Sequence, residues 1–424
     1  MKSFFRRPLL MALFIAAVTS ITVIQLEPLY AQYGAAPAGK AAAKAKQGKA
    51  DATTARREVG TPINDALKLV EAKDWNGAVA KVQLADAVKD KTPYEEFMVA
   101  KYLAYIAVNR EPQDLATATT AVNRQIASNG APDPEKPNMY SMGMLLNYAN
   151  MDFAKVIQSA EEYGKLGQPM NEQQYIVLAQ AYYSTMDFMN AAKVAKAGSD
   201  QKPSPENLGL LLNSQAKLMD DAGYRVTLDK LATVSAQPEV WGQVMDFALN
   251  EVTKTTPLNE HHLLNLYRLA MVVGTMRPED YPAMATIDLA NGLPNEAKEA
   301  LTKGGRTTGA LMDDTAKMLG NDQGSLTGLA AEAGKQTNGE IDVKLGESYL
   351  TYGRNDEAVT ALRQGIQKGG LKDLPDAQTT LGIALYKVGK KDEALAEFRK
   401  AEMASSTVRA VAHTWVLFLQ RPAA

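Results

Sequence analysis

The chain of 424 residues has no cysteine and only three histidines. It can therefore form no disulfide bond, thiolate zinc site or iron–sulfur cluster, and it has no thiol for catalysis. Aromatic residues make up only 7% of the sequence, and no alternating run of β-branched residues is long enough to predict a strand. The composition predicts an all-α fold that is stabilised by packing alone.

A formal net charge of −2 hides an uneven distribution of charge along the chain. Residues 1–57 contain nine Lys or Arg and two acidic residues, which leaves 37 basic and 46 acidic residues in the remainder. A body with this acidic excess repels phosphate backbones, so we expect no nucleic acid among its partners.

The N-terminus has the pattern of an export signal. Lys2, Arg6 and Arg7 precede an uncharged apolar run over about residues 8–26, and the small residue Ala31 follows at a suitable cleavage position. We expect a cleaved signal peptide at 1–31 and a periplasmic protein. The alternative is an uncleaved inner-membrane anchor with the body facing the periplasm, because the run is nearly long enough to span a bilayer.

Residues 32–57 consist mainly of Ala, Gly, Lys and Thr and offer almost nothing apolar to bury. This composition predicts a disordered basic linker that acts as a spacer. Contact with anionic lipid or an acidic polymer is the alternative. We therefore expect membrane contact only through an uncleaved signal or this linker.

Two tandem copies of one 36-residue pattern lie between Glu340 and Met403. Each copy has a small residue where two helices approach closely, a glycine that ends the first helix, and an alanine where the second helix packs back. The positions of the first copy are Leu345, Gly346, Tyr349, Gly353, Ala358, Leu362 and Gly365, and those of the second are Leu381, Gly382, Leu385, Gly389, Ala394, Phe398 and Ala401.

This pattern resembles the tetratricopeptide repeat (TPR), which implies an α-solenoid of stacked helix-turn-helix repeats. Weaker copies precede it, and the tripeptide Met-Asp-Phe begins both at Met151 and at Met186. We expect one continuous solenoid with the following parts: divergent repeats over 58–303, a glycine-rich degenerate repeat over 304–339, two well-formed units over 340–404 and a C-terminal capping helix over 405–424.

The resemblance also implies a concave groove that receives extended or helical segments of partner proteins. Residues expected to line it in the two well-formed units are Glu347, Leu350, Thr351, Thr379, Ile383, Tyr386 and Lys387, and those in an earlier unit are Gln180 and Tyr183. The alternative for Leu350 and Ile383 is that they fill the core between repeats.

Two residue clusters could suggest a metal site. His261 and His262 are adjacent, so on a helix they point about 100° apart and cannot chelate one ion together; we expect first-turn surface residues. Met139, Met142 and Met144 could offer thioethers to Cu(I), but methionine commonly fills irregular gaps in a core, and core packing is the preferred interpretation. We expect no cofactor and no metal.

No nucleophile elbow or poised carboxylate pair is found, and repeat-like helices occupy nearly all of 61–419. The sequence therefore predicts a non-enzymatic scaffold that binds protein partners during assembly or organisation of the bacterial cell envelope. The alternative is an accessory protein that binds glycan or takes part in polysaccharide export, with Tyr183 and Tyr386 as sugar platforms.

Overall fold

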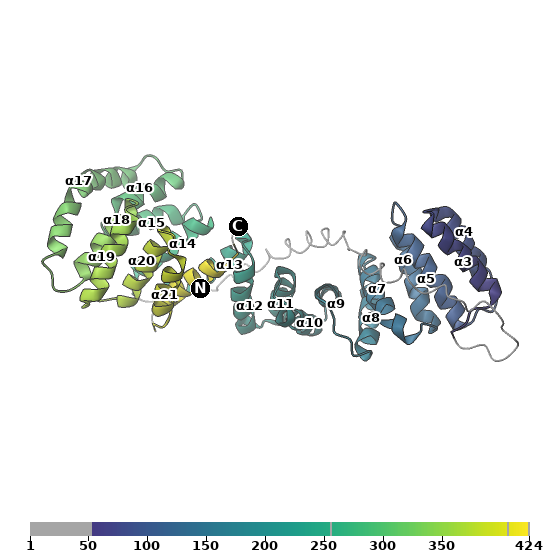
Figure 1. Ribbon diagram of the computed structural model, residues 1–424. Coiled ribbons are helices and arrows are strands. Elements are labelled where there is room, and N and C mark those ends of the chain that lie inside the picture. The colour runs from purple at the N-terminus through teal and green to yellow at the C-terminus, as the bar shows by residue number, and fades with distance from the viewer. Residues whose placement is uncertain (1–52, 255–256, 405–406, 423–424) are drawn as a thin grey trace. The chain divides into compact units, whose positions relative to one another are not determined.

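The computed structural model describes residues 53–254, 257–404 and 407–422. The expected signal at 1–31 lies outside the described residues, as does the expected linker apart from residues 53–57. Among the described residues there are helices and no strands, so the all-α prediction is confirmed (Figure 1). No described helix is both long and apolar enough to cross a membrane.

Contacts within the chain group the helices into two compact units, where we expected one continuous array. The units divide between Thr227 and Leu228, inside helix α12 (Asp221–Val234). Each unit is described by itself below.

Unit 1 is a series of helices in which sequence neighbours pack together, as an α-solenoid requires. Proline or a capping side chain marks several helix starts; Thr92, for example, forms a capping box with Glu95 at the start of α5. The helices that precede α12 are α3 (Arg57–Glu71), α4 (Trp75–Asp86), α5 (Pro93–Asn109), α6 (Leu115–Ser128), the short 3-10 helix η2 (Asp133–Glu135), α7 (Lys136–Ala149), α8 (Phe153–Lys165), α9 (Glu172–Ser184), α10 (Phe188–Gln201) and α11 (Pro205–Leu218).

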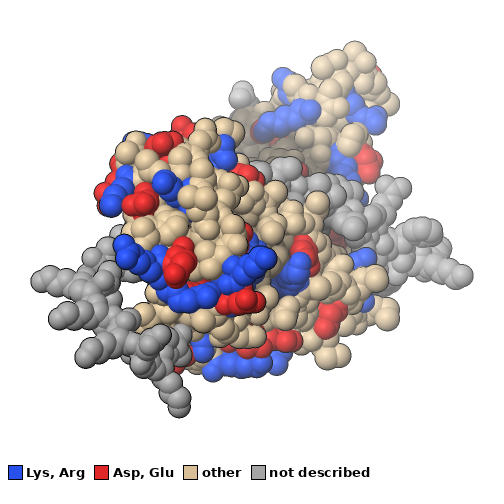
Figure 2. Space-filling model, turned by 90° about the vertical axis from the view of Figure 1, so that its right-hand side faces the viewer, with Lys and Arg blue, Asp and Glu red and all other residues tan. Residues whose placement is uncertain are grey.

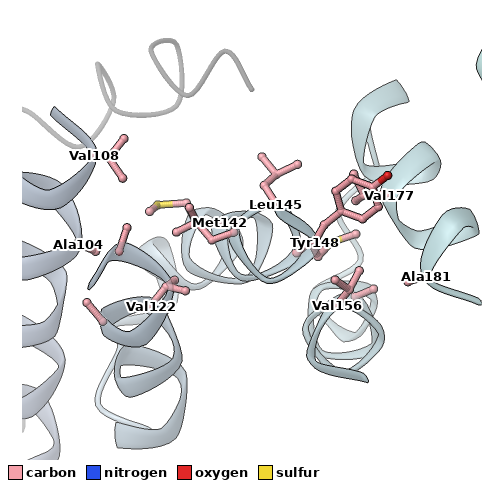
Figure 3. Close-up of a cluster of buried hydrophobic side chains, with 14 of the residues drawn as sticks. Ala104, Val108, Val122, Met142, Leu145, Tyr148, Val156, Val177 and Ala181 are labelled. Carbon is pink, nitrogen blue, oxygen red and sulfur yellow. The ribbon is translucent and has the colours of Figure 1, made fainter. Parts of the chain in front are cut away.

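The core of unit 1 runs through α5 to α9. Figure 3 shows side chains from these five helices meeting in one cluster. Met142 of α7 lies towards Val122 of α6, and Tyr148 of α7 lies beside Val156 of α8 and Val177 of α9. Met139, Met142 and Met144 are all buried, so their predicted core packing is confirmed.

One turn geometry recurs between paired helices in both units. A residue with positive φ follows the first helix, and the next amide donates to a carbonyl five residues back, which is the hydrogen bond of a helix-ending glycine motif. Gly353 and Gly389 occupy this position, as predicted. The same position is held by Lys73, Met151, Met186 and Gly292.

Unit 2 is also built from helices that pack on their sequence neighbours (Figure 1). The interval predicted to be a degenerate repeat holds one long helix, α17, in place of a helix pair. The helices that follow α12 are α13 (Pro238–Thr253), α14 (Glu260–Val273), α15 (Asp280–Ala290), α16 (Pro294–Lys303), α17 (Ala310–Ala333), α18 (Glu340–Thr351), α19 (Asn355–Lys368), α20 (Leu374–Lys387), α21 (Lys391–Glu402) and α22 (Val408–Gln420).

Helix α22 covers α21, as a capping helix would, but it is also enclosed by the start of unit 2. The Trp415 ring stacks on Phe398 of α21 with centroids 5.2 Å apart, and Phe418 lies edge-on to Trp241 of α13. Nearly all of its residues are buried, although Arg409 is exposed. Both ends of unit 2 therefore meet at α22.

Candidate functional site

Helix α14 of unit 2 is buried along most of its length, and it carries a row of polar side chains. Residues 262–270 are all buried. His261, Asn265 and Arg268 follow one another at spacings of four and three, which places them on one face of the helix. This face meets acidic and hydroxyl groups of α16, α18 and α20.

His261 joins the two helices that begin the well-formed units. Its Nε2 lies 2.7 Å from Glu347 Oε1 of α18, and its Nδ1 lies 2.5 Å from Asp376 Oδ2 of α20. Asn265 donates to the other oxygen of Asp376 at 3.0 Å and to the Thr380 hydroxyl at 3.3 Å. The two repeats are thus fixed to α14 by charged and amide contacts.

Arg268 extends this network towards α16. It donates to both carboxylate oxygens of Glu296, at 2.9 and 2.6 Å, and to Glu347 at 3.3 Å. All three side chains are less than 10% exposed. We call this set the buried polar network; its members are His261, Asn265, Arg268, Asp288, Glu296, Glu347 and Asp376.

Burial and charge act in opposite directions on the pKa values of this network. Burial would lower the pKa of His261, but the carboxylates of Glu347 and Asp376 raise it well above its usual value. Burial would raise the pKa of Glu347, but His261 and Arg268 lower it to about 2. His261 is therefore an imidazolium at neutral pH, and Glu347 is a carboxylate.

Asp288 of α15 is the one acidic member of the network that stays uncharged. Its carboxyl oxygens are buried and find no hydrogen-bond donor among the described residues. Burial, with the charge of Glu296 nearby, raises the pKa of Asp288 to about 10. Asp288 therefore keeps its proton at neutral pH, because a second buried carboxylate beside Glu296 would be unpaired.

Most of the residues predicted to line a groove in the well-formed units are buried against other residues of this chain. Leu350 and Ile383 are 3% and 1% exposed, which fits the alternative that they fill the core. Glu347 and Thr379 are buried, and Thr351 is half-buried. Tyr386 packs on Trp415 and Phe418, whereas Lys387 is exposed.

The predicted surface location of the two neighbouring histidines is wrong. They do lie in the first turn of α14, which Asn259 caps. His262, however, is buried, and its ring contacts the Asp373 carboxylate at 2.9 Å and the Thr407 hydroxyl at 2.6 Å. The row of polar residues that interrupts the leucines of α14 was the signal that sequence reasoning missed.

Unit 1 offers an open site between α3 and α5. Figure 1 shows these two helices side by side at one end of unit 1. A hollow of about 230 Å³ lies between them and is closed on one side by the segment that leads into α7. Its walls are Ala55, Gly60, Ile63, Asn64, Leu67, Tyr94, Phe97, Met98, Lys101, Tyr102, Pro132 and Glu135. We call it the α3–α5 hollow.

The α3–α5 hollow combines aromatic faces with a small number of polar groups. Lys101 Nζ lies 2.7 Å from Glu135 Oε1. Burial and the charge of Glu135 raise the pKa of Tyr94, and burial, with Tyr94 and Glu135, raises that of Tyr102, so both phenols stay protonated. Apolar walls with a few convergent polar groups are typical of binding sites.

The two groove residues predicted in unit 1 lie on α9, and they remain at least partly accessible. Gln180 and Tyr183 are half-buried, and Gln180 donates to the exposed Ser184 hydroxyl at 3.2 Å. The Tyr183 ring lies edge-on to Phe188 at 5.2 Å. These residues do not line the α3–α5 hollow.

The charge on the face that is visible in Figure 2 indicates no second candidate site. On the face that Figure 2 shows, Lys and Arg lie among Asp and Glu and form no large patch of one sign. Among the described residues, no group of three or more His, Asp or Glu is placed to hold a metal ion. Comparison of the chain with models of known protein families and with curated proteins gives no match.

Proposed function

We propose that this chain is an exported, non-enzymatic TPR scaffold that binds segments of protein partners in the bacterial cell envelope, in the assembly or organisation of envelope components. The observation that carries this proposal is the α3–α5 hollow. It lies between the first helices of two successive helix pairs, where the resemblance to the TPR places a binding groove, and its aromatic walls remain accessible.

The chemistry of the hollow suits one anchoring side chain of a partner segment. Tyr94, Met98 and Tyr102 provide apolar surface, and Asn64 provides an exposed amide at the rim. Aromatic pockets of this kind provide most of the binding energy at protein interfaces, because tyrosine buries a large area at a small cost in entropy.

A glycan ligand is the second candidate, and the half-buried Tyr94 and Tyr102 in the wall of the hollow favour it. Sugar rings stack on aromatic faces beside hydrogen-bonding groups, and Tyr102 with Asn64 offers both. Of the two expected platforms, Tyr183 is half-buried on α9, and Tyr386 packs against Trp415. The hollow is therefore the place to compare the two ligand classes.

A photoreactive amino acid at position 64 tests the proposal in cells. We expect it to crosslink one protein of defined mass, whereas the same group at Gln83, which is exposed on α4, should not. The purified partner should bind the full chain, and Tyr102→Ala should weaken binding at least about tenfold. Equal capture from both positions, or affinity for glycan alone, would contradict a protein scaffold.

Export is a separate part of the proposal. The charged start and apolar run predict a mature N-terminus at Gln32 or within a few residues of it. Intact-mass measurement of the protein from the envelope fraction checks this. A chain that retains Met1 in the membrane would instead support the anchored alternative.

A further inference from the structure

The α3–α5 hollow is lined by one face of each of its two helices. Tyr94, Met98 and Tyr102 recur every four residues along α5, so they lie on the same side of that helix. Gly60 and Asn64 have the same spacing on α3. Both tyrosines are half-buried, and a Cβ at Gly60 would have no atom within 4 Å. The hollow therefore presents two accessible aromatic side chains opposite a position that adds no bulk.

The walls of the hollow contain one positive and one negative side chain, Lys101 and Glu135. Lys101 Nζ lies 2.7 Å from Glu135 Oε1. The two partners differ in accessibility, because the side chain of Lys101 is only 5% exposed, whereas that of Glu135 is 28% exposed. Glu135 Oε2 can accept a further hydrogen bond. A ligand in the hollow therefore meets the carboxylate, while the ammonium group of Lys101 is covered.

Aromatic rings beside an accessible carboxylate favour a cation over other ligand groups. The face of a tyrosine ring attracts an ammonium or guanidinium group, and partial exclusion of water strengthens this attraction. Burial, and then the charge of Glu135, raises the pKa of Tyr94; burial, with Tyr94 and Glu135, raises that of Tyr102. An anion would be repelled by Glu135. An apolar group would cover Glu135 Oε2 without offering a donor, which costs free energy.

We infer that the α3–α5 hollow binds one basic side chain, of lysine or arginine, from a segment of the protein partner. The cationic group contacts a tyrosine ring and Glu135 Oε2, and the methylene groups of its stem pack on Met98. Long basic side chains suit such a site, since the stem is apolar and only the tip is charged. This inference rests on the proposed function, because it names the anchoring residue of the partner at the same site.

Selection of displayed peptides tests the chemistry of this anchor before the natural partner is known. The full chain selects from short random peptides displayed on phage, and a parallel selection uses the Tyr102→Leu chain. We expect the peptides that only the unaltered chain enriches to share one lysine or arginine. Peptides that share an apolar or acidic residue instead would overturn the inference, as would two selections that give the same peptides.

An enriched peptide is then synthesised with its anchor replaced by an uncharged residue of similar shape, citrulline for arginine or norleucine for lysine. Replacement should weaken binding to the full chain at least about tenfold, because the cation–π contact and the charge-assisted hydrogen bond are both lost. Tyr102→Phe keeps the ring face, so it should bind the original peptide almost as tightly as the unaltered chain does. Equal affinities of the charged and uncharged peptides would contradict a cation site.

A double substitution tests the role of the carboxylate. Glu135→Gln alone would leave Lys101 buried without its partner, so it is combined with Lys101→Met, which removes both charges and keeps the net charge constant. This variant should bind the charged peptide at least about fivefold more weakly, at a melting temperature that confirms folding. Asp133→Asn, whose side chain is 91% exposed on the same segment, should change affinity by less than about twofold. Unchanged affinity in the double variant, or an equal loss in both, would exclude Glu135 as the partner of the cation.

The two proposals fail separately. If the photoreactive group at position 64 captures a protein in cells but the selected anchors are not basic, the cation site is wrong and the scaffold stands. If the selected anchors are basic and depend on Tyr102 but no protein is captured in cells, the cation site stands and the scaffold is wrong.

Discussion

At the scale of single residues, the buried polar network of unit 2 dominates the energetics. Arg268, Glu296 and Glu347 are withdrawn from water, and each is compensated by the others. Removal of one partner from such a set typically costs about 3–5 kcal/mol, since the remaining charge stays buried. The pKa shifts in this network therefore translate into a pH dependence of folding.

Asp288→Asn tests the uncharged carboxyl. Between about pH 4 and pH 10, Asp288 is protonated in the folded chain and ionised in the unfolded chain, so folding takes up a proton and stability falls as pH rises. Asparagine cannot ionise. The stability of the Asp288→Asn variant relative to the unaltered chain should therefore increase by roughly 2 kcal/mol or more from pH 5 to pH 8.

Urea unfolding at the two pH values measures this difference, with Asp392→Asn at an exposed position as the control. The stability of the control should be within about 0.5 kcal/mol of that of the unaltered chain at both pH values. An Asp288→Asn effect that is the same at pH 5 and pH 8 would mean that Asp288 is ionised in the folded chain.

His261→Gln should show a pH trend of the same sign, with a cost that falls as pH rises, but over a higher pH range. The pKa of His261 is raised, so the stability that it contributes is fully present below about pH 6.5 and is lost as pH rises through the folded-state pKa. We expect the substitution to cost about 3 kcal/mol at pH 6 and less at pH 10. Thermal or urea unfolding across this range measures the loss.

His413 provides the matched control. It also contacts two carboxylates, those of Asp229 and Glu402, but it is about one-quarter exposed. Water screens such a pair, so His413→Gln should cost no more than about 1 kcal/mol. A loss at His261 that does not change with pH would show that packing, not charge, explains its role.

At the scale of helices, the sequence predicted the paired units because their signals are local. The glycine that ends a helix with positive φ, and the small residue at a close contact between helices, both lie within one 36-residue repeat. The glycines at 353 and 389 took the predicted turn position. Met151 and Met186 adopt the same turn without glycine, so the glycine pattern did not predict it there; the repeated tripeptide indicated only weaker copies of the repeat.

Two glycine-to-alanine substitutions distinguish the effect of a close contact between helices from the effect of helix propensity. A Cβ at Gly346 would lie 2.5 Å from Leu362 Cγ, whereas one at Gly328 of α17 would have no atom within 4 Å. Gly346→Ala should therefore destabilise by about 1–3 kcal/mol. Gly328→Ala should stabilise by up to about 1 kcal/mol, because alanine favours the helix.

Urea midpoints of the two variants provide the comparison. Both substitutions add one methyl group to a helix. A midpoint that falls for Gly346→Ala but rises for Gly328→Ala would therefore be due to the close contact with Leu362. If Gly328→Ala destabilised the chain, that face of α17 would need a contact that the described residues do not show.

At the scale of the molecule, the contacts that the sequence could not predict join distant residues. His262 and Asp373 are 111 positions apart, and Trp415 and Asn265 are 150 apart. No repeat pattern encodes such pairs, since each helix face is compatible with solvent, a partner or another part of the chain. This is why the expected groove residues Leu350 and Ile383 could not be distinguished from core residues by sequence.

Trp415 joins the last helix of unit 2 to its beginning. Its ring stacks on Phe398 of α21, while its indole Nε1 donates to the backbone oxygen of Asn265 in α14 at 3.1 Å. Trp415→Ala should cost about 3–5 kcal/mol, since it empties a buried site and leaves that oxygen without its donor. Arg409→Ala, on the exposed side of the same helix, should be nearly neutral.

Hydrogen exchange shows whether Trp415 acts across the unit. Because α14 contacts α22 directly, Trp415→Ala should accelerate exchange in α14 as well as in α21 and α22. Trp415→Phe keeps most of the stacking but removes the hydrogen bond and part of the buried ring, so its loss should be smaller than that of Trp415→Ala, at about 1–3 kcal/mol. If Trp415→Ala affected α21 and α22 but left α14 unchanged, α22 would act only as the predicted cap, and the contact with α14 would carry little of the stability of unit 2.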